Sequence, residues 1–384
     1  MNDDTHPLFP RCTTLLADPR LHAALRRQLP GHQGEDAALA AIHPHDPMLL
    51  HSLQHHGDAA LAVSQYYGVA LQQHRAALQV MAACGVAPGR ARILDFACGY
   101  GRWLRLLVGA AGAAQVVAAD IDVDAVDFVR ARFGVDARAS HADPARFDAP
   151  ERFDFIWVAS LFSHLPHALF IGWLARLHAL LSPTGVLCFS VRDRALLPAG
   201  EAGDGLRYET RSENPRLDPA IYGTTYADAD YVGDALRHAG AGGPWRRLPR
   251  ALAMEQDLYV VARDAGHDLS ALDGFRHGPW GWLDRCTWEA GVLRVQGWSG
   301  ARGDRPATAI EVRVDGGLER HATGVSRDDV AAAFDDPRLA DCGFDARIAT
   351  GAAPPAWLEI DALDAHGART LLFAGPPPMA NAAG

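Results

Sequence analysis

The sequence predicts an α/β protein in which a doubly wound sheet follows an N-terminal helical cap and precedes a C-terminal all-β sandwich. Strand and helix patterns alternate from residue 60 to 264, a glycine turn follows the first strand of that alternation, and short strands dominate from 267 to 375. Buried strands that alternate with amphipathic helices form a parallel sheet covered on both faces, whereas closely spaced short strands form antiparallel sheets.

Residues 1–59 form the expected helical cap, because prolines repeatedly interrupt their helical pattern. His51 and His55 have the i, i+4 spacing that places two side chains on one helix face. No third ligand follows in an H-E-x-x-H pattern, so these histidines are expected to face solvent or substrate and no metal site is predicted.

The middle region, residues 60–264, is expected to contain the doubly wound sheet. Its helices are expected at 60–83, 103–111, 124–133, 167–181 and 228–238, and its strands at 92–96, 115–120, 153–159, 186–191 and 257–262. Residues 193–226 interrupt the alternation with a polar segment rich in glycine and proline. Long ordered loops of this kind are often functional.

Residues 267–375 are expected to form the sandwich domain, and residues 376–384 a flexible tail. The strands are expected at 286–289, 292–297, 309–314, 343–348 and 357–362, with a short helix at 328–334. Glycine, proline and aspartate turns separate these strands, which is typical of an antiparallel sandwich.

Composition limits the possible partners and compartment. Hydrophobic residues make up 49% of the chain, enough for a large core, and a net charge of -10 without a basic run argues against nucleic acid as a partner. All 36 basic residues are arginine, which excludes a Schiff-base lysine. The cysteines form no C-x-x-C pair, and the sequence shows neither a signal-peptide pattern nor a long apolar run. A cytoplasmic protein without membrane insertion is therefore expected, and its oligomeric state stays open.

The segment from Asp95 to Gly101 has the pattern of a ligand-binding turn. The strand that contains Asp95 leads into Gly99-Tyr100-Gly101 and then into a helix. Glycines let the backbone approach a ligand, and a helix start offers free N–H donors. Asp120 ends the next strand, where a carboxylate can accept hydrogen bonds from both hydroxyls of a ribose. The pattern therefore predicts a nucleoside site at this edge of the sheet.

Leu104 and Asp95 disfavour a dinucleotide and favour a nucleoside that carries an amino acid. The dinucleotide pattern G-x-G-x-x-G requires glycine at position 104, which is leucine here. Asp95 would repel a pyrophosphate and attract a cationic amino group. A nicotinamide-dependent oxidoreductase stays as an alternative, and so does a non-catalytic glycan-binding or scaffold protein.

The glycine turn resembles the first motif of class I S-adenosylmethionine-dependent methyltransferases, an acidic residue followed by G-x-G. Further segments resemble later motifs of that family in the same order, at 119–122, 141–143, 153–165 and 180–187, with Thr184 replacing one glycine. The resemblance covers residues 60–264 and implies a Rossmann-like sheet that binds S-adenosylmethionine. The cofactor-binding residues that it implies are Asp95, Cys98, Gly99, Gly101, Asp120, Ile121, Asp143 and Ser160.

The resemblance also implies which part of the cofactor each of these residues would contact. Asp95 and the backbone of the turn would hold the methionine part, Asp120 the ribose, and Ile121 with Asp143 the adenine. A helix N-cap is the alternative role for Asp95. The acceptor is expected to be a small molecule or a glycan-related compound, methylated at oxygen.

Methyl transfer mainly requires that the acceptor atom and the methyl group lie in line. It requires a base only when the acceptor is a hydroxyl or a protonated amine. His164, just after the fourth expected strand, is the candidate base, with packing or positioning as the alternative. Tyr222 and Tyr226 end the long polar segment and are expected to close over the substrate, with an ordinary turn as the alternative.

The C-terminal region loosely resembles sandwich modules appended to bacterial glycosyltransferases. The residues that carry this resemblance are Gly297-Trp298, 312–316, 328–334 and Gly343-Phe344. Exposed tryptophans in this region could stack on sugars, and core packing is the alternative. The candidates are Trp280, Trp282, Trp288 and Trp298.

Overall fold

The computed structural model describes residues 5–198, 201, 203–212, 217–301 and 309–379. Residues 380–384 of the expected tail and the first four residues lie outside the described ones. The chain divides into two compact units, one formed by Met1–Gln72 together with Arg276–Gly384 and the other by Gln73–Phe275. The segment boundaries expected at 59/60 and 264/267 stay predictions.

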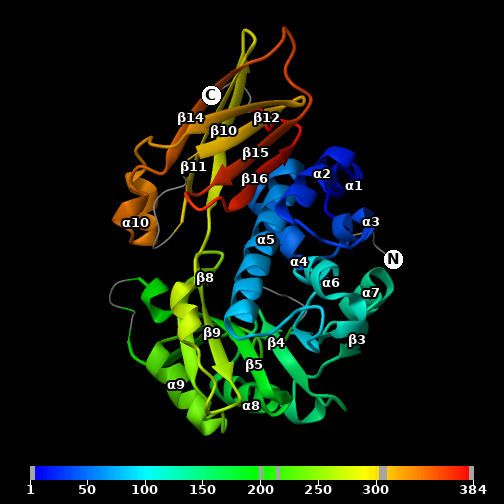
Figure 1. The fold of residues 1–384 in the computed structure, drawn as a ribbon, viewed down its shortest axis with the longest axis vertical. Coiled ribbons are helices and arrows are strands. Elements are labelled where there is room, and N and C mark those ends of the chain that lie inside the picture. Colours follow the sequence, from blue (N-terminus) through cyan, green and yellow to red (C-terminus); the bar gives the residue numbers. More distant parts are fainter. Residues whose placement is uncertain (1–4, 199–200, 202, 213–216, 302–308, 380–384) are drawn as a thin grey trace. The chain divides into compact units, whose positions relative to one another are not determined.

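The second unit contains the predicted parallel sheet (Figure 1). Its strands follow the order β3-β2-β1-β4-β5, and each pairs in parallel with its neighbour. Their bounds are Ile93–Phe96 for β1, Val116–Asp120 for β2, Asp136–Ala139 for β3, Phe153–Val158 for β4 and Leu181–Arg192 for β5. The chain reverses its winding direction at β1, so the carboxyl ends of β1 and β4 border the crevice where ligands of such sheets bind.

Four shorter or antiparallel strands extend the sheet beyond β5. They are β6 (Leu206–Glu209), β7 (Thr224–Ala227), β8 (Trp245–Leu252) and β9 (Gln256–Ala262). β9 pairs with β5 in the antiparallel sense, and β7 pairs with β5 at Arg192 and Tyr226. β6 and β7 lie inside the segment that the sequence predicts as a long polar loop, so that segment is partly ordered as a hairpin.

Helices connect the strands where the sequence predicts them. Their bounds are Leu104–Ala111 for α6, Val123–Phe133 for α7, His167–Ala179 for α8 and Ala229–His238 for α9. Asp122 caps α7 and Asp228 caps α9, each by accepting a hydrogen bond from a backbone N–H of the first turn. β5 begins earlier than expected, because Leu181 already pairs with Phe153 before the register shifts.

The first unit contains the predicted antiparallel strands, arranged in two sheets. One has the order β10-β11-β14 and the other β13-β12-β15-β16. Their bounds are Trp280–Glu289 for β10, Val292–Gly300 for β11, Ala309–Val314 for β12, Gly317–Ala322 for β13, Gly343–Ala349 for β14, Leu358–Leu363 for β15 and Arg369–Gly375 for β16. The short helix α10 (Asp328–Phe334) lies where the sequence predicts it. β13 and β16 are strands that the sequence pattern did not predict.

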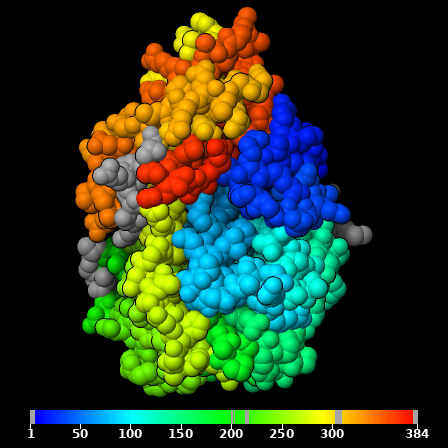
Figure 2. Space-filling view, in the orientation of Figure 1, coloured from blue at the N-terminus to red at the C-terminus, as the bar shows by residue number. Residues whose placement is uncertain are grey.

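The N-terminal helices belong to the same unit as these sheets. They are α1 (Phe9–Leu16), α2 (Pro19–Gln28), α3 (Asp36–Ala40), α4 (Pro47–His56) and the first part of α5 (Ala59–Ala83). The Gln28 side-chain amide donates to Asp361 Oδ1 over 2.7 Å, and the Ala374 backbone N–H donates to Ser64 Oγ over 3.0 Å. Figure 2 shows the dark blue N-terminal residues beside the red C-terminal strands. Segments from both ends of the sequence therefore share one core.

Among the described residues, no helix has both the length and the hydropathy needed to cross a bilayer.

Candidate functional site

The turn after β1 is held in place by the neighbouring strand. The Cys98 N–H donates to the carbonyl of Ala119 over 3.1 Å, and the Gly99 N–H donates to Asp120 Oδ2 over 2.8 Å. A Cβ on Gly101 would lie 2.7 Å from the Phe133 ring, whereas a Cβ on Gly99 would meet nothing within 4 Å. Gly101 is therefore required for packing, and Gly99 borders open space that a ligand can occupy.

Ala97 is a feature of this turn that the sequence analysis missed. Its φ is 58°, in the same left-handed region as Gly99 at 52° and Gly101 at 76°. A residue with a Cβ is strained there, at a cost of about 1–2 kcal/mol. The sequence carried no signal of this conformation, because alanine is not a residue that favours a positive φ.

Asp95 is a buried carboxylate that the protein leaves partly unsatisfied. Its side chain is 4% exposed, and Oδ2 has no hydrogen-bond partner among the described residues. Burial and the nearby Asp120 raise the pKa of Asp95 well above its ordinary value. Asp95 lies within β1, and α6 begins only at Leu104, so Asp95 is not the N-cap of that helix.

Asp120 is oriented by two backbone groups. Besides the bond from Gly99, its Oδ1 accepts from the Asp122 N–H over 2.9 Å. Burial raises the pKa of Asp120, although these two bonds favour the charged form. Each carboxylate oxygen can accept a second hydrogen bond. The side chain is thus fixed at the end of β2 with acceptor capacity remaining.

The two residues expected near the adenine lie on loops after neighbouring strands. Ile121 is 37% exposed and Val123 is 57% exposed, so apolar surface faces outward just beyond Asp120. Asp143 is exposed, and its Oδ1 accepts from the Ala145 N–H over 3.0 Å, which caps the 3-10 turn Pro144–Arg146. Val123 is a candidate for contact with the adenine that the sequence analysis did not name.

Ser160 is the first member of a hydrogen-bonded group after β4. Its φ is 62°, and its backbone N–H donates to Ser190 Oγ over 2.7 Å. The Ser190 hydroxyl in turn donates to Gln256 Oε1 over 2.6 Å. Ser190 and Gln256 are buried and come from β5 and β9. No local motif reveals them, because residues 160, 190 and 256 meet only in the folded sheet.

His164 is anchored between two segments. Its ring is 3% exposed and stacks on Tyr222, with the ring centroids 4.4 Å apart. Its Nδ1 lies 2.7 Å from the carbonyl oxygen of Gly223, which can only accept, so Nδ1 carries a proton. In the neutral ring the basic nitrogen is then Nε2.

The structure brings some of the predicted residues together and distributes others. Asp95, Cys98, Gly99 and Asp120 form one connected group at the ends of β1 and β2. His164 and Tyr222 form a second group. The remaining predicted residues follow other strands: Ile121 after β2, Asp143 after β3, Ser160 after β4, and the half-buried Tyr226 within β7.

Part of the second unit matches a known protein family. A family model described as a methyltransferase domain matches residues 93–185. No curated protein matches the chain. One similar solved structure is 1,6-didemethyltoxoflavin-N1-methyltransferase from Burkholderia thailandensis with bound S-adenosylhomocysteine. It is 20% identical over 50% of this chain and 78% of that chain, with a TM-score of 0.37.

Two further structures are similar at comparable levels. Magnesium protoporphyrin IX methyltransferase from Synechocystis is 14% identical over 53% of this chain and 86% of that chain, with a TM-score of 0.34. An O-methyltransferase family protein from Burkholderia thailandensis is 18% identical over 67% of this chain and 71% of that chain, with a TM-score of 0.37.

The family match defines the class of the central domain. Residues 93–185 are a class I S-adenosylmethionine-dependent methyltransferase domain. The protein is an S-adenosylmethionine-dependent methyltransferase, and the nicotinamide alternative is set aside. The match does not extend into the C-terminal sheets, and their expected resemblance to glycosyltransferase modules is not supported.

Proposed function

We propose that this enzyme methylates a hydroxyl oxygen of a small-molecule or glycan-related acceptor, with His164 as the general base. The observation that carries the proposal is the Nδ1 contact of His164 with the Gly223 carbonyl. It fixes the tautomer in which Nε2 can accept a proton. An oxygen acceptor needs such a group, because its hydroxyl proton must leave as the new bond forms.

The residues at the ends of β1 and β2 fit the cofactor. Asp95 Oδ2 is buried without a partner among the residues described, and an ammonium group would satisfy it. Asp120 would accept from the ribose hydroxyls, and Gly99 leaves room beside the backbone. When bound, S-adenosylmethionine supplies a methyl group on a positively charged sulfur. The proposed cofactor residues remain those named from the sequence, with Val123 added.

The roles proposed for the two tyrosines differ. Tyr222 stacks on His164 and restricts rotation of the imidazole, so we assign it a positioning role as well as contact with the acceptor. Tyr226 pairs through its backbone with Arg192 and Arg207, and its half-buried side chain is proposed to contact the acceptor. The Thr225 N–H donates to the Ser163 carbonyl over 2.8 Å, which ties this strand to the segment that holds His164.

The test replaces His164 with asparagine. His164→Asn can still donate a hydrogen bond to the Gly223 carbonyl but has no second nitrogen that accepts a proton. Formation of S-adenosylhomocysteine is measured with methyl glycosides, catechol and simple phenols, and with benzylamine as a nitrogen acceptor. We expect kcat for an oxygen acceptor to fall about 100- to 10,000-fold, with an unchanged thermal shift by S-adenosylmethionine.

A matched control separates catalysis from folding. His167, which contacts the Tyr231 hydroxyl at 2.9 Å on the exposed surface, is replaced in the same way, and kcat is expected to stay the same. Retention of wild-type kcat by His164→Asn would contradict the role of His164. Turnover of benzylamine without turnover of any hydroxyl compound would contradict the oxygen acceptor.

A further inference from the structure

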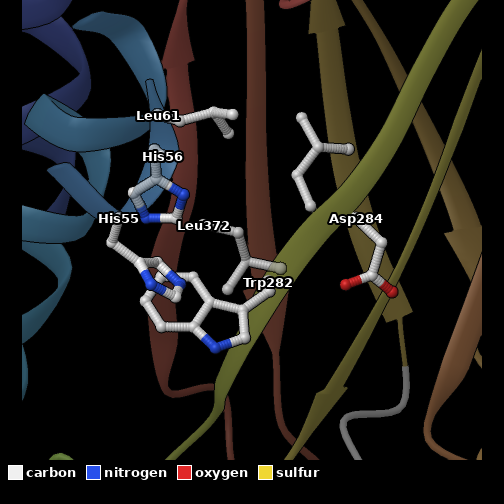
Figure 3. Close-up of a pocket in the computed structure, with 7 residues that line it drawn as sticks. His55, His56, Leu61, Trp282, Asp284 and Leu372 are labelled. Atoms are coloured by element: carbon white, nitrogen blue, oxygen red, sulfur yellow. The ribbon is translucent and has the colours of Figure 1, made fainter. Parts of the chain in front are cut away.

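A cavity in the first unit is assembled from residues of both ends of the chain. Its volume is about 210 Å³. α4 contributes His55 and His56, β10 contributes Trp282 and Asp284, and β16 contributes Leu372 (Figure 3). Drug-sized ligands occupy pockets of roughly 300–1,000 Å³, so this cavity suits a single ring with its substituents. All of its lining residues lie outside the methyltransferase domain.

The lining is half apolar and half polar. Leu61, Leu283 and Leu372 supply aliphatic surface, and Trp282 supplies an indole ring that is only half-buried. The Trp282 ring contacts the His56 ring edge to face, with centroids 5.9 Å apart, and the Trp280 ring, with centroids 5.4 Å apart. These contacts hold the indole in position before any ligand arrives.

Histidines and a carboxylate supply the polar side of the cavity. Burial, followed by the neighbouring His55, lowers the pKa of His56, so its ring is neutral near pH 7 and can donate one hydrogen bond and accept another. Nε2 of His56 is buried without a well-formed hydrogen bond among the described residues, and the Gln65 side chain also interacts with this ring. An unsatisfied buried group of this kind is stabilised when a ligand hydroxyl supplies the missing bond.

The carboxylate of Asp284 is paired with an arginine. Asp284 Oδ2 lies 2.5 Å from Arg327 Nη1, but Arg327 also pairs with Asp329, so these three side chains together keep a net negative charge. The other oxygen of Asp284 can still accept a hydrogen bond. A ligand that fits the indole and the hydrogen-bonding groups of this lining has one apolar face and carries hydroxyl groups around its rim.

From this lining we propose that the cavity binds one neutral pyranose ring, stacked on Trp282 and hydrogen-bonded by His56. A pyranose has a face of C–H groups that packs on an indole, and hydroxyls that both donate and accept. The other candidate tryptophans are less suited. Trp280 is 5% exposed and Trp298 is 4% exposed, and the Trp288 N–H donates to Thr350 Oγ1 over 2.9 Å. The site is independent of the proposed methyl transfer and of the nature of its acceptor.

The experiment measures binding of sugars to the full chain by saturation-transfer NMR. The probes are the methyl glycosides of glucose, galactose, mannose and N-acetylglucosamine, with tetramethylammonium as a cationic comparison. We expect at least one glycoside to bind with a dissociation constant of about 1 mM, the weak affinity typical of few contacts. We expect its ring protons to receive more saturation than its methyl group.

Variants assign the binding to this cavity. Trp282→Ala and His56→Ala are each expected to weaken glycoside binding about tenfold, the loss that corresponds to one good contact. Trp282→Phe keeps an aromatic ring and is expected to weaken it less. Trp288→Phe is the control, and its binding is expected to equal that of the wild type.

Two results would overturn the proposal. One is the absence of saturation transfer to every glycoside at about 20 mM, well above the expected dissociation constant, including the case in which only tetramethylammonium binds. The other is unchanged glycoside binding in both Trp282→Ala and His56→Ala. The thermal shift by S-adenosylmethionine reports on the other unit and confirms that each variant is folded there. Failure of the sugar site therefore remains distinguishable from failure of the proposed methyl transfer.

Discussion

Asp95 in the second unit and Asp361 in the first unit are both buried carboxylates, and both have a pKa above the ordinary value. Asp361 is 1% exposed and accepts hydrogen bonds from Gln28 over 2.7 Å and from Arg369 over 2.6 Å. Asp95 is 4% exposed, and its Oδ2 has no partner among the described residues. Asp361, which joins segments of the first unit, therefore has hydrogen-bond partners, whereas Asp95 keeps one oxygen that the cofactor can use.

The largest loss of stability is expected when a hydrogen-bond partner of Asp361 is removed. Arg369 also donates to Glu311 over 2.7 Å, so Arg369→Met leaves the buried Asp361 without its hydrogen-bonded cation, whereas Glu311 keeps Arg313. Breaking a buried pair in this way costs about 3–5 kcal/mol. We expect urea denaturation of the first unit to show a loss of that size. Arg294→Met breaks the more exposed pair with Asp345 in the other sheet of the same unit, and should cost much less. Equal losses in the two variants would contradict this account.

The pH dependence of stability is the next largest effect. Burial, followed by Glu359, raises the pKa of Asp361 to about 6 from 3.8. The folded state therefore binds a proton more tightly than the unfolded state between these values, and stability falls as pH rises from about 4 to 6, by roughly 3 kcal/mol, then levels off. Asp361→Asn should remove this slope. A slope that persists unchanged in Asp361→Asn would assign it to other groups.

Asp95→Asn should affect the cofactor more than the fold. The amide is uncharged and cannot form an ion pair with an ammonium group. We therefore expect the dissociation constant of S-adenosylmethionine, measured by calorimetry, to rise about 10- to 100-fold. Because the buried charge disappears, the unliganded protein should be at least as stable as the wild type. Asp127→Asn, on the exposed face of α7, is the control and should change neither property. Loss of stability without loss of affinity would make Asp95 a structural residue.

The smallest effect is expected at Ala97. Its positive φ is strained for a residue with a Cβ, so Ala97→Gly should stabilise the second unit by about 0.5–1 kcal/mol in thermal unfolding. Ala137→Gly, in β3 with ordinary strand geometry, is the matched control and should destabilise by a similar amount. Destabilisation in both variants would show that the strain at Ala97 is not released by glycine.

Local patterns were sufficient to predict the elements that hold the cofactor residues. β1, β2 and β4 are short runs of buried residues bounded by turns, and the structure places them within a residue or two of the expected bounds. β13 was missed because its side chains are almost all exposed, so it has no apolar alternation. β6 and β7 were missed because they lie in a polar segment and pair mainly with each other.

The long-range parts of the site could not be predicted. Ser160, Ser190 and Gln256 are polar residues far apart in the sequence, and the pairing of β4 and of β9 with β5 brings them together. The cavity beside Trp282 likewise combines residues near positions 55, 282 and 372. No single sequence shows such distant pairs. The hydrogen bond from Gln28 to Asp361 spans 333 positions and depends on the same kind of contact.

The composition of the first unit has a consequence for synthesis on the ribosome. Residues 1–72 emerge first, but the strands that complete their core belong to 276–384 and emerge last. Domains fold as units once their residues are available, so Gln73–Phe275 can fold while the early helices still expose apolar surface. During synthesis, Gln73–Phe275 can therefore complete its fold before the other unit does. Chaperone binding at that stage should map to residues 1–72.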